Sequence, residues 1–301
     1  MGALVPGDAN EFIERQLNEQ LLKIAGQFSS ESPVDILSFT GPLFEGVDNL
    51  IRTAIERLKS ESKCERLVVI LTTKGGYIEP VRRMVDTMRT HYACVDFVIP
   101  DYAYSAGTVL AMSGDSIHMD YYSRLGPIDP QEEVKGGEKL VPALGYLEQY
   151  KRLIRKAKRG TITLAEIQIL INVFDQAELY KYEHERELSI ALLKQWLVKY
   201  KFKNWKRTET RGIAVTDAMR EQRAGQIAKA LNNIKRWHTH GHGISKDVLQ
   251  NDLNLKIDDF GQNPDRSSSI RAYYDLLRDY MAKRSCRGVV HTKYAYGPFV
   301  M

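Results

Sequence analysis

The apolar residues of this chain fall into short continuous runs and into stripes with helical spacing. The runs are typical of buried strands and lie, in chain order, at 35–39, Leu67–Leu71, Val95–Pro100 and Ile117–Met119. Between them, at 47–58 and 78–88, apolar residues recur three and four positions apart, which predicts helices. Strand and helix therefore alternate from about residue 35 to residue 120, and this order predicts a parallel sheet crossed by helices.

The rest of the chain is predicted to be mainly helical. Residues 9–28 carry an apolar stripe typical of an amphipathic helix, and we expect this helix to contribute to oligomerisation. Charged and glycine-containing residues at 132–139 predict a loop. Further helices are expected at 142–202, 218–237, 245–253 and 270–281, and the tail after them is expected to be irregular.

These patterns predict an α/β fold with a parallel-sheet core, crossing helices and a helical C-terminal half. Three parts are expected: an N-terminal helix at 1–30, a main domain at 31–260, and a C-terminal helix and tail at 261–301. The chain has 301 residues, of which 43% are apolar, so it has enough apolar surface for a sizeable core. This composition excludes global disorder.

Charge and cysteine content limit the expected partners and compartment. The formal net charge of +5 permits contacts with acidic partners without implying them. Cys64, Cys94 and Cys286 are an odd number of cysteines without metal-ligand spacing, which favours reduced thiols in a cytoplasmic protein. No apolar run approaches the roughly 20 residues needed to cross a bilayer, and the first residues have no signal-peptide core, so we expect a soluble protein.

Two basic runs, at 151–159 and 199–211, carry most of the local positive charge. Such runs are usually the solvated faces of helices, and this is the interpretation that we favour. The alternative is a nucleic-acid site, whose affinity would fall steeply with salt. The near-neutral balance of the rest of the chain makes nucleic acid an unlikely partner.

Ser105 is the first candidate for chemistry. It follows a strand-like run and precedes a helix-compatible run that starts at Ala106. Small residues after the serine allow a sharp turn and the approach of a substrate, and a helix start offers free N–H groups to a developing oxyanion. The alternative is that Ser105 only caps the helix, since serine is a preferred N-cap residue, and spacing alone favours the cap.

A second glycine turn changes this balance. Gly75 and Gly76 follow the strand at Leu67–Leu71, where paired glycines allow a backbone N–H to point outward. The N–H groups of Gly76 and Ala106 are thus candidates for a two-donor oxyanion hole, in which one donor contributes about 3 kcal/mol. A lone glycine pair is usually an ordinary turn. Two turns at the ends of neighbouring strands, one of them carrying a serine, are a stronger signal.

Three motifs carry a family resemblance: TTKGG, then YSAGTVLAMSGD, then SRLGPIDPQ. Together they resemble the serine dehydrogenase proteinase family, which is related to signal peptide peptidase A, within the Clp-protease/crotonase-like superfamily. The segment Gly126–Gln131 is the most specific match, and Thr239-His240 and Leu192-Leu193 are similar to looser family features. The resemblance implies a Clp/crotonase-like core and a serine peptidase.

The resemblance assigns roles to matching positions. It implies that Ser105 is the nucleophile and that Gly76 and Ala106 form the oxyanion hole. Gly75 and Tyr77 are predicted to contact substrate, which we expect to add as a strand beside the glycine turn. The chain departs from the Clp branch at two places. Thr73-Lys74 stands where that branch often has serine-proline, and Ile128 falls where its histidine is expected. A Clp-type Ser-His-Asp triad is therefore not expected.

Another base must activate Ser105, because a neutral hydroxyl is a poor nucleophile. The signal-peptide-peptidase branch uses a lysine, and Lys181 is our first candidate by a loose alignment; Lys139 and Lys156 are alternatives. For each lysine, a solvated surface role is the competing interpretation.

His240 is the remaining candidate base. His238, His240 and His242 alternate in a glycine turn, but no acidic or cysteine partner stands at ligand spacing, so a structural role is favoured over a metal site. Asp129, between two prolines, is expected to bond backbone N–H groups.

The predicted function is that of a soluble serine endopeptidase with a Ser-Lys dyad as the first candidate and no cofactor or metal. Its expected partners are a protein or peptide substrate and further copies of itself. The alternative is an inactive Clp/crotonase-fold scaffold or binding subunit in which Ser105 is a cap. Labelling by a fluorophosphonate probe separates the two.

Overall fold

The computed structural model describes residues 6–29, 32–128, 131–133, 140–237 and 243–299. Within these residues the centre of the molecule is a seven-stranded sheet of order β10-β5-β3-β2-β1-β11-β12. Its strands are β1 (Val34–Thr40), β2 (Arg66–Thr72), β3 (Cys94–Val98), β5 (Ser116–Met119), β10 (Asp258–Asp259), β11 (Gly288–Thr292) and β12 (Ala295–Phe299). The α/β class predicted from the sequence is confirmed.

The predicted strands form the parallel part of this sheet. β1, β2, β3 and β5 are parallel neighbours, with Leu37 opposite Val69 and Phe97 opposite both Val69 and Ile117. Their central residues are buried on both faces, which explains why they appear in the sequence as continuous apolar runs rather than as alternating patterns.

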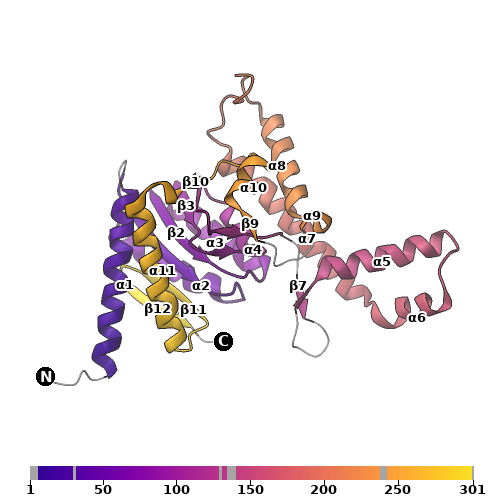
Figure 1. Cartoon of the computed structure of the whole chain (residues 1–301), viewed down its shortest axis with the longest axis horizontal. Coiled ribbons are helices and arrows are strands. Elements are labelled where there is room, and N and C mark those ends of the chain that lie inside the picture. Colours follow the sequence, from indigo (N-terminus) through magenta and orange to yellow (C-terminus); the bar gives the residue numbers. More distant parts are fainter. Residues whose placement is uncertain (1–5, 30–31, 129–130, 134–139, 238–242, 300–301) are drawn as a thin grey trace.

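Helices cover both faces of the sheet (Figure 1). One face carries α2 (Val47–Glu61), α3 (Ile78–His91) and α4 (Ala106–Ala111), which pack with Phe39, Val69 and Leu71. The other face carries α1 (Pro6–Phe28) and α11 (Pro264–Lys283), which pack with Ile36, Val68 and Ile70. The two sets of strand residues alternate along β1 and β2, as successive side chains point to opposite faces.

The apolar stripe predicted for residues 9–28 is the inner face of α1. Leu17, Leu21 and Ile24 are fully buried against the sheet and α11. The stripe is therefore used within the chain. α1 and α11 thus pack together on one face of the central sheet.

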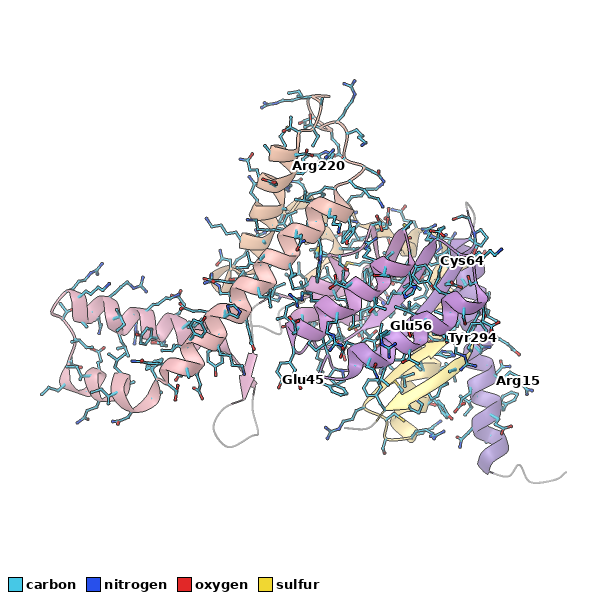
Figure 2. The ribbon with its side chains drawn as sticks, turned by 180° about the vertical axis from the view of Figure 1, so that it is seen from behind. Arg15, Glu45, Glu56, Cys64, Arg220 and Tyr294 are labelled. Atoms are coloured by element: carbon cyan, nitrogen blue, oxygen red, sulfur yellow. The ribbon has the colours of Figure 1, made fainter. Side chains whose placement is uncertain are left out.

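The C-terminal tail differs from the sequence prediction. It was expected to be irregular, but β11 and β12 form a hairpin that adds to the sheet, with β11 antiparallel to β1. The first strand of this hairpin has the sequence Gly-Val-Val-His-Thr. Its apolar run is too short for the hydrophobic pattern alone to distinguish a strand from a loop. The hairpin also lies near the end of α2, and Figure 2 labels Tyr294 in the hairpin and Glu56 on that helix. The guanidinium carbon of Arg57 is 5.5 Å from the ring centroid of Tyr294.

The segment after β6 (Arg124–Leu125) also differs in part. Its predicted loop at 132–139 is flanked by two short paired strands, β7 (Gln131–Glu133) and β8 (Leu140–Pro142). A further small sheet has the order β4-β6-β9, with β4 (Tyr102–Ala103) parallel to β6 and β9 (Ile244–Ser245) antiparallel to it.

The C-terminal half is helical, as predicted. It contains α5 (Ala143–Lys158), α6 (Leu164–Val173), α7 (Gln176–Trp196), a π-helical turn η1 (Leu197–Lys201), α8 (Asp217–Leu231), α9 (Ile234–Trp237), α10 (Lys246–Asn251) and the 3-10 turn η2 (Phe260–Gln262). The end of α7 packs on the body through Leu193 and Trp196. Its beginning extends away from the body with α5 and α6, and these three helices form an arm (Figure 1).

Candidate active site

Ser105 connects β4 to α4 and has an unusual backbone conformation. Its φ is 52° and its ψ is −122°, outside the regions that residues with a side chain normally occupy. Such a conformation costs of order 1–3 kcal/mol and persists only where the surrounding structure imposes it. A strained strand-to-helix turn is how a nucleophilic serine is held exposed in other hydrolases.

This geometry does not fit the alternative in which Ser105 is an ordinary cap. N-cap residues usually have extended backbones, and their side chains accept a bond from the helix. The Ser105 hydroxyl makes no capping hydrogen bond to α4. The capping role alone therefore gives no account of the strain at this position.

The glycine turn lies directly against Ser105. A Cβ atom built on Gly75 would stand 2.7 Å from the Ser105 Cβ and 3.3 Å from the backbone nitrogen of Ala106. Gly75 also has a φ of 97°, which disfavours any residue with a side chain. The structure thus brings together the two turns that the sequence places 30 residues apart.

Two backbone donors at these turns are available to a ligand. The N–H of Gly75 donates to the Oγ1 of Thr73 at 3.0 Å. Within the described part of the chain, the N–H groups of Gly76 and Ala106 have no hydrogen-bond acceptor. Unpaired N–H groups on adjacent turns are what a two-donor oxyanion hole requires.

Buried hydroxyls connect the turns to the sheet. Thr73 pairs with Ala103 as an isolated parallel bridge, and its methyl group occupies the place where a Cβ on Gly107 would be. The Oγ1 of Thr108 donates to the carbonyl of Ala103 at 2.7 Å and accepts the N–H of Gly126 at 2.9 Å. Threonine side chains thus fix β4, α4 and β6 around Ser105.

The loop after β1 holds the other side of the glycine turn. Leu43 donates its N–H to the carbonyl of Gly75 at 2.9 Å, and its carbonyl accepts the N–H of Tyr77 at 2.7 Å. A Cβ on Gly76 would lie 2.0 Å from the Leu43 carbonyl oxygen, so only glycine fits there. The Tyr77 side chain, the predicted substrate contact, is 55% exposed beside this turn.

β9 begins four residues after the candidate histidine in the sequence. Arg124 pairs with Ser245, and Gly243 lies against the Arg124 side chain, where a Cβ would be 2.9 Å from its Cδ. His240 precedes Gly243 by three residues but lies outside the described residues, as do Asp129 and Lys139. Their roles stay predictions.

The two described candidate lysines lie on the arm. Lys156 of α5 is ion-paired with Glu166 of α6 at 2.5 Å. Lys181 is exposed on α7, beside Tyr182, which packs with Leu147 of α5. Along the helix axis, Leu188, which packs against the main core, is about 10 Å further on. The predicted dyad with Ser105 stays a prediction.

Two other buried bases were not singled out in the sequence. Burial lowers the pKa of His118 to about 4, and its ring packs edge-on against Phe28, on the α1 side of the sheet. The α4 helix after Ser105 packs on the opposite side. Burial also lowers the pKa of Lys201 to about 8, while the charge of Asp258 opposes this effect. These shifts depend on tertiary packing, which no local pattern reports.

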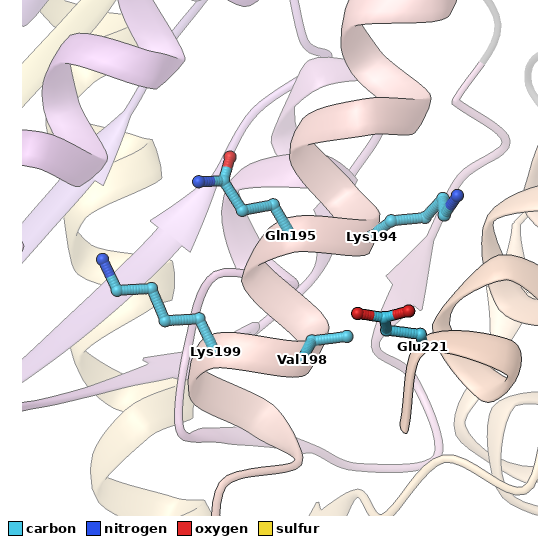
Figure 3. A pocket seen from close by; sticks show the side chains of 5 residues that line it. All are labelled: Lys194, Gln195, Val198, Lys199 and Glu221. Atoms are coloured by element: carbon cyan, nitrogen blue, oxygen red, sulfur yellow. The ribbon is translucent and has the colours of Figure 1, made fainter. Parts of the chain in front are cut away.

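The described residues contain no cluster of three or more His, Cys, Asp or Glu side chains that is suited to a metal ion. A groove of about 400 Å³ lies between the end of α7, η1 and α8 (Figure 3). It is lined by Lys194, Gln195, Val198, Lys199 and Glu221, none of which is a predicted site residue.

Comparison with known proteins supports the resemblance seen in the motifs. Residues 44–187 match the family model of the ClpP-like SDH-type serine proteinases. The predicted resemblance is confirmed over this part of the chain. The match contains Gly76, Ser105 and Ala106, and it supports a serine peptidase of the ClpP-like SDH type.

Two uncharacterized proteins of Methanocaldococcus jannaschii are similar to part of this chain. MJ1495 is 32% identical over 115 residues, which are 38% of this chain and 37% of the relative. MJ0137 is 31% identical over 113 residues, 38% of each protein. The chain thus spans less than two fifths of the length of these curated relatives. Among solved structures, ClpP1 from Listeria monocytogenes gives a TM-score of 0.41 at 12% identity, covering 81% of this chain and 94% of that chain.

Proposed function

We propose that this protein is a serine endopeptidase in which Ser105 is the nucleophile. A base takes the proton of the Ser105 hydroxyl as its oxygen attacks the carbonyl carbon of a peptide bond. The N–H groups of Gly76 and Ala106 hold the resulting oxyanion. The amine product leaves with a proton, and water then hydrolyses the acyl-enzyme to release the acid and restore the serine.

The observation that carries this proposal is the strained Ser105 backbone packed against Gly75. The strain positions a hydroxyl, and the two neighbouring turns place unpaired N–H groups beside it. A scaffold protein would have no use for this combination, because each feature costs folding stability. The family match over residues 44–187 supports the same chemistry.

The base is proposed to be one of the four candidates. A lysine base must have a pKa lowered toward neutrality. Because the usual pKa of lysine is higher than that of histidine, we expect activity to rise at a higher pH with a lysine base than with a histidine base. Lys181→Met and His240→Ala separate the two by the pH profile of kcat/KM. Replacing the true base removes the rise of kcat/KM with pH. In the same variant, fluorophosphonate still labels Ser105 at high pH, which shows that the site is intact.

The test of the nucleophile is labelling of the folded chain with a fluorophosphonate probe. We expect a covalent adduct on Ser105, located by mass spectrometry, and cleavage of a denatured protein at internal peptide bonds. Ser105→Ala abolishes both, whereas the matched control Ser60→Ala, an exposed serine on α2, retains both. A folded wild-type chain that is neither labelled nor active on any denatured protein would contradict the proposal.

We further propose that the protein is a cytoplasmic homo-oligomer. All three cysteines are free thiols, as expected in a reducing compartment. Among the described residues, Phe12 and Leu22 on the outer side of α1 are 53% and 45% exposed. Light scattering of the purified chain measures the oligomer, and Phe12→Ser with Leu22→Ser is expected to dissociate it.

A further inference from the structure

The helix α6 presents apolar side chains to solvent along its whole length. None of its residues is buried. Its exposed apolar side chains are Leu164, Ile167, Ile169, Ile171 and Val173. Leu164 is 82% exposed and Ile171 is 72% exposed. A helix that is apolar on most of its sides is normally covered, and a cluster of this kind marks an interaction site.

The adjoining end of α5 is strongly basic. Residues 151–159 contain six Lys and Arg residues and no acidic residue. Some of these cations are neutralised within the arm, since Lys151 pairs with Glu183 and Lys156 with Glu166. In contrast, Arg152, Lys158 and Arg159 have no ion-pair partner in the part of the chain that the structure describes. The exposed apolar helix is thus bordered by uncompensated positive charge.

This combination favours an anionic lipid surface over a second copy of the chain. Exposed apolar side chains beside Lys and Arg residues bind the boundary between headgroups and acyl chains, because apolar burial and the attraction of the cations to anionic lipids add together. Residues 151–173 carry six Lys and Arg residues and one acidic residue, Glu166. A second copy docked tip to tip would bring two such basic segments together, which opposes association. The apolar side chains alone do not decide between these occupants, but the charge does.

The shape of the arm permits this contact. The arm extends away from the body, with α5 and α6 at its outer end (Figure 1). It can therefore lie on a flat surface without a clash from the sheet. At ten residues, α6 is about 15 Å long, half of the roughly 30 Å bilayer core, and no helix of the described residues is long and apolar enough to cross a membrane. The contact is therefore one along the surface.

We propose that the arm tip, residues 151–173, docks onto an anionic membrane surface. The apolar side chains of α6 lie among the headgroups and outer acyl chains, and Arg152, Lys158 and Arg159 contact the anionic headgroups. The proposal is independent of the peptidase chemistry at Ser105. It places the candidate active site beside a membrane surface.

The test is flotation of the full chain with vesicles. We expect the wild type to float with vesicles that contain phosphatidylglycerol and not with pure phosphatidylcholine, and added salt to weaken binding, because salt screens the attraction. Leu164→Ser with Ile171→Ser, and separately Lys158→Glu with Arg159→Glu, reduce the partition coefficient about tenfold or more. Matched controls are Ile213→Ser, at a 51% exposed isoleucine outside the arm, and Lys63→Glu, at an exposed lysine before β2.

Three results would overturn the proposal. Equal flotation with both vesicle types shows that the charge has no role, and unchanged flotation of both arm variants shows that the arm is not the site. The third result comes from light scattering. If the wild type does not bind vesicles and the Leu164→Ser/Ile171→Ser variant dissociates from an oligomer, the occupant of this surface is a second copy of the chain. Unchanged circular dichroism and thermal unfolding confirm that each variant is folded.

Discussion

The Oγ1 of Thr73 accepts the backbone N–H of Gly75 at 3.0 Å, and this buried bond fixes the turn that carries Gly76. The backbone of Thr73 is in turn bonded to the strand before Ser105, with its N–H on the carbonyl of Tyr102 and its carbonyl on the N–H of Tyr104. One residue therefore ties the two turns of the candidate site together.

Thr73→Val removes the hydroxyl while keeping the shape of the side chain. We expect kcat to fall about tenfold to hundredfold with little change in KM, because misplacing an oxyanion donor affects the transition state more than substrate binding. Thr73→Ser restores the oxygen and is expected to recover most of the activity. Steady-state kinetics on one peptide substrate measures the three proteins. Equal loss in both variants would indicate that packing by the methyl group, rather than the hydrogen bond, is what matters.

Gly75→Ala tests the close approach of the two turns. Its Cβ would collide with the Ser105 Cβ and with the carbonyl of Tyr104, both at 2.7 Å. Gly46→Ala is a matched control, because Gly46 has nearly the same φ, 98° against 97°, and no atom within 4 Å of a Cβ. Both variants are expected to lose about 1 kcal/mol of stability from the backbone alone. Only Gly75→Ala is expected to lose fluorophosphonate labelling as well; labelling at the wild-type rate would contradict the described geometry.

Ser105→Gly tests whether strain is stored at the nucleophile. Glycine adopts a positive φ without penalty, whereas alanine does not. We therefore expect Ser105→Gly to be more stable than Ser105→Ala by about 1 kcal/mol, although both are inactive. Urea unfolding of the two variants gives the difference directly. If the Ser105→Ala variant were as stable as the Ser105→Gly variant or more stable, the turn would relax once the serine is removed.

Lys201 predicts a pH dependence of stability. Burial lowers its pKa from 10.5 to about 8, so between these values the unfolded chain binds more protons than the folded chain. The contribution of Lys201 to stability therefore rises as pH increases from about 8 to 10.5. Lys201→Met removes this slope and is expected to raise the free energy of unfolding at neutral pH.

Lys199→Met, at an exposed lysine of the same turn, is the control for this effect. It is expected to leave both the slope and the neutral-pH stability unchanged. Urea unfolding across that pH range measures the wild type and both variants. A wild-type slope that persists in Lys201→Met would assign the titration to other groups.

The sequence alone determined the layered core. The runs at Leu67–Leu71 and Val95–Pro100 are buried strands because a parallel sheet covered on both faces needs apolar residues throughout, and such runs are visible without a structure. The helices at 47–58 and 78–88 were visible for the same reason, since their inner faces repeat every three to four residues. The turns at Gly75 and Ser105 were visible as a candidate site only in combination, because a lone glycine pair is usually an ordinary turn and a lone serine there is usually a cap.

Tertiary structure decided the rest. The tail at 288–299 forms strands because the edge of β1 is open to it, and the strained turn at Ser105 lies against Gly75, 30 residues away in the sequence. Likewise, the apolar stripe of α1 is satisfied by α11, whereas the apolar residues of α6 are left exposed. Local pattern fixes which residues need burial, but only the packed chain determines which partner provides it, because burial is a property of contacts between distant segments.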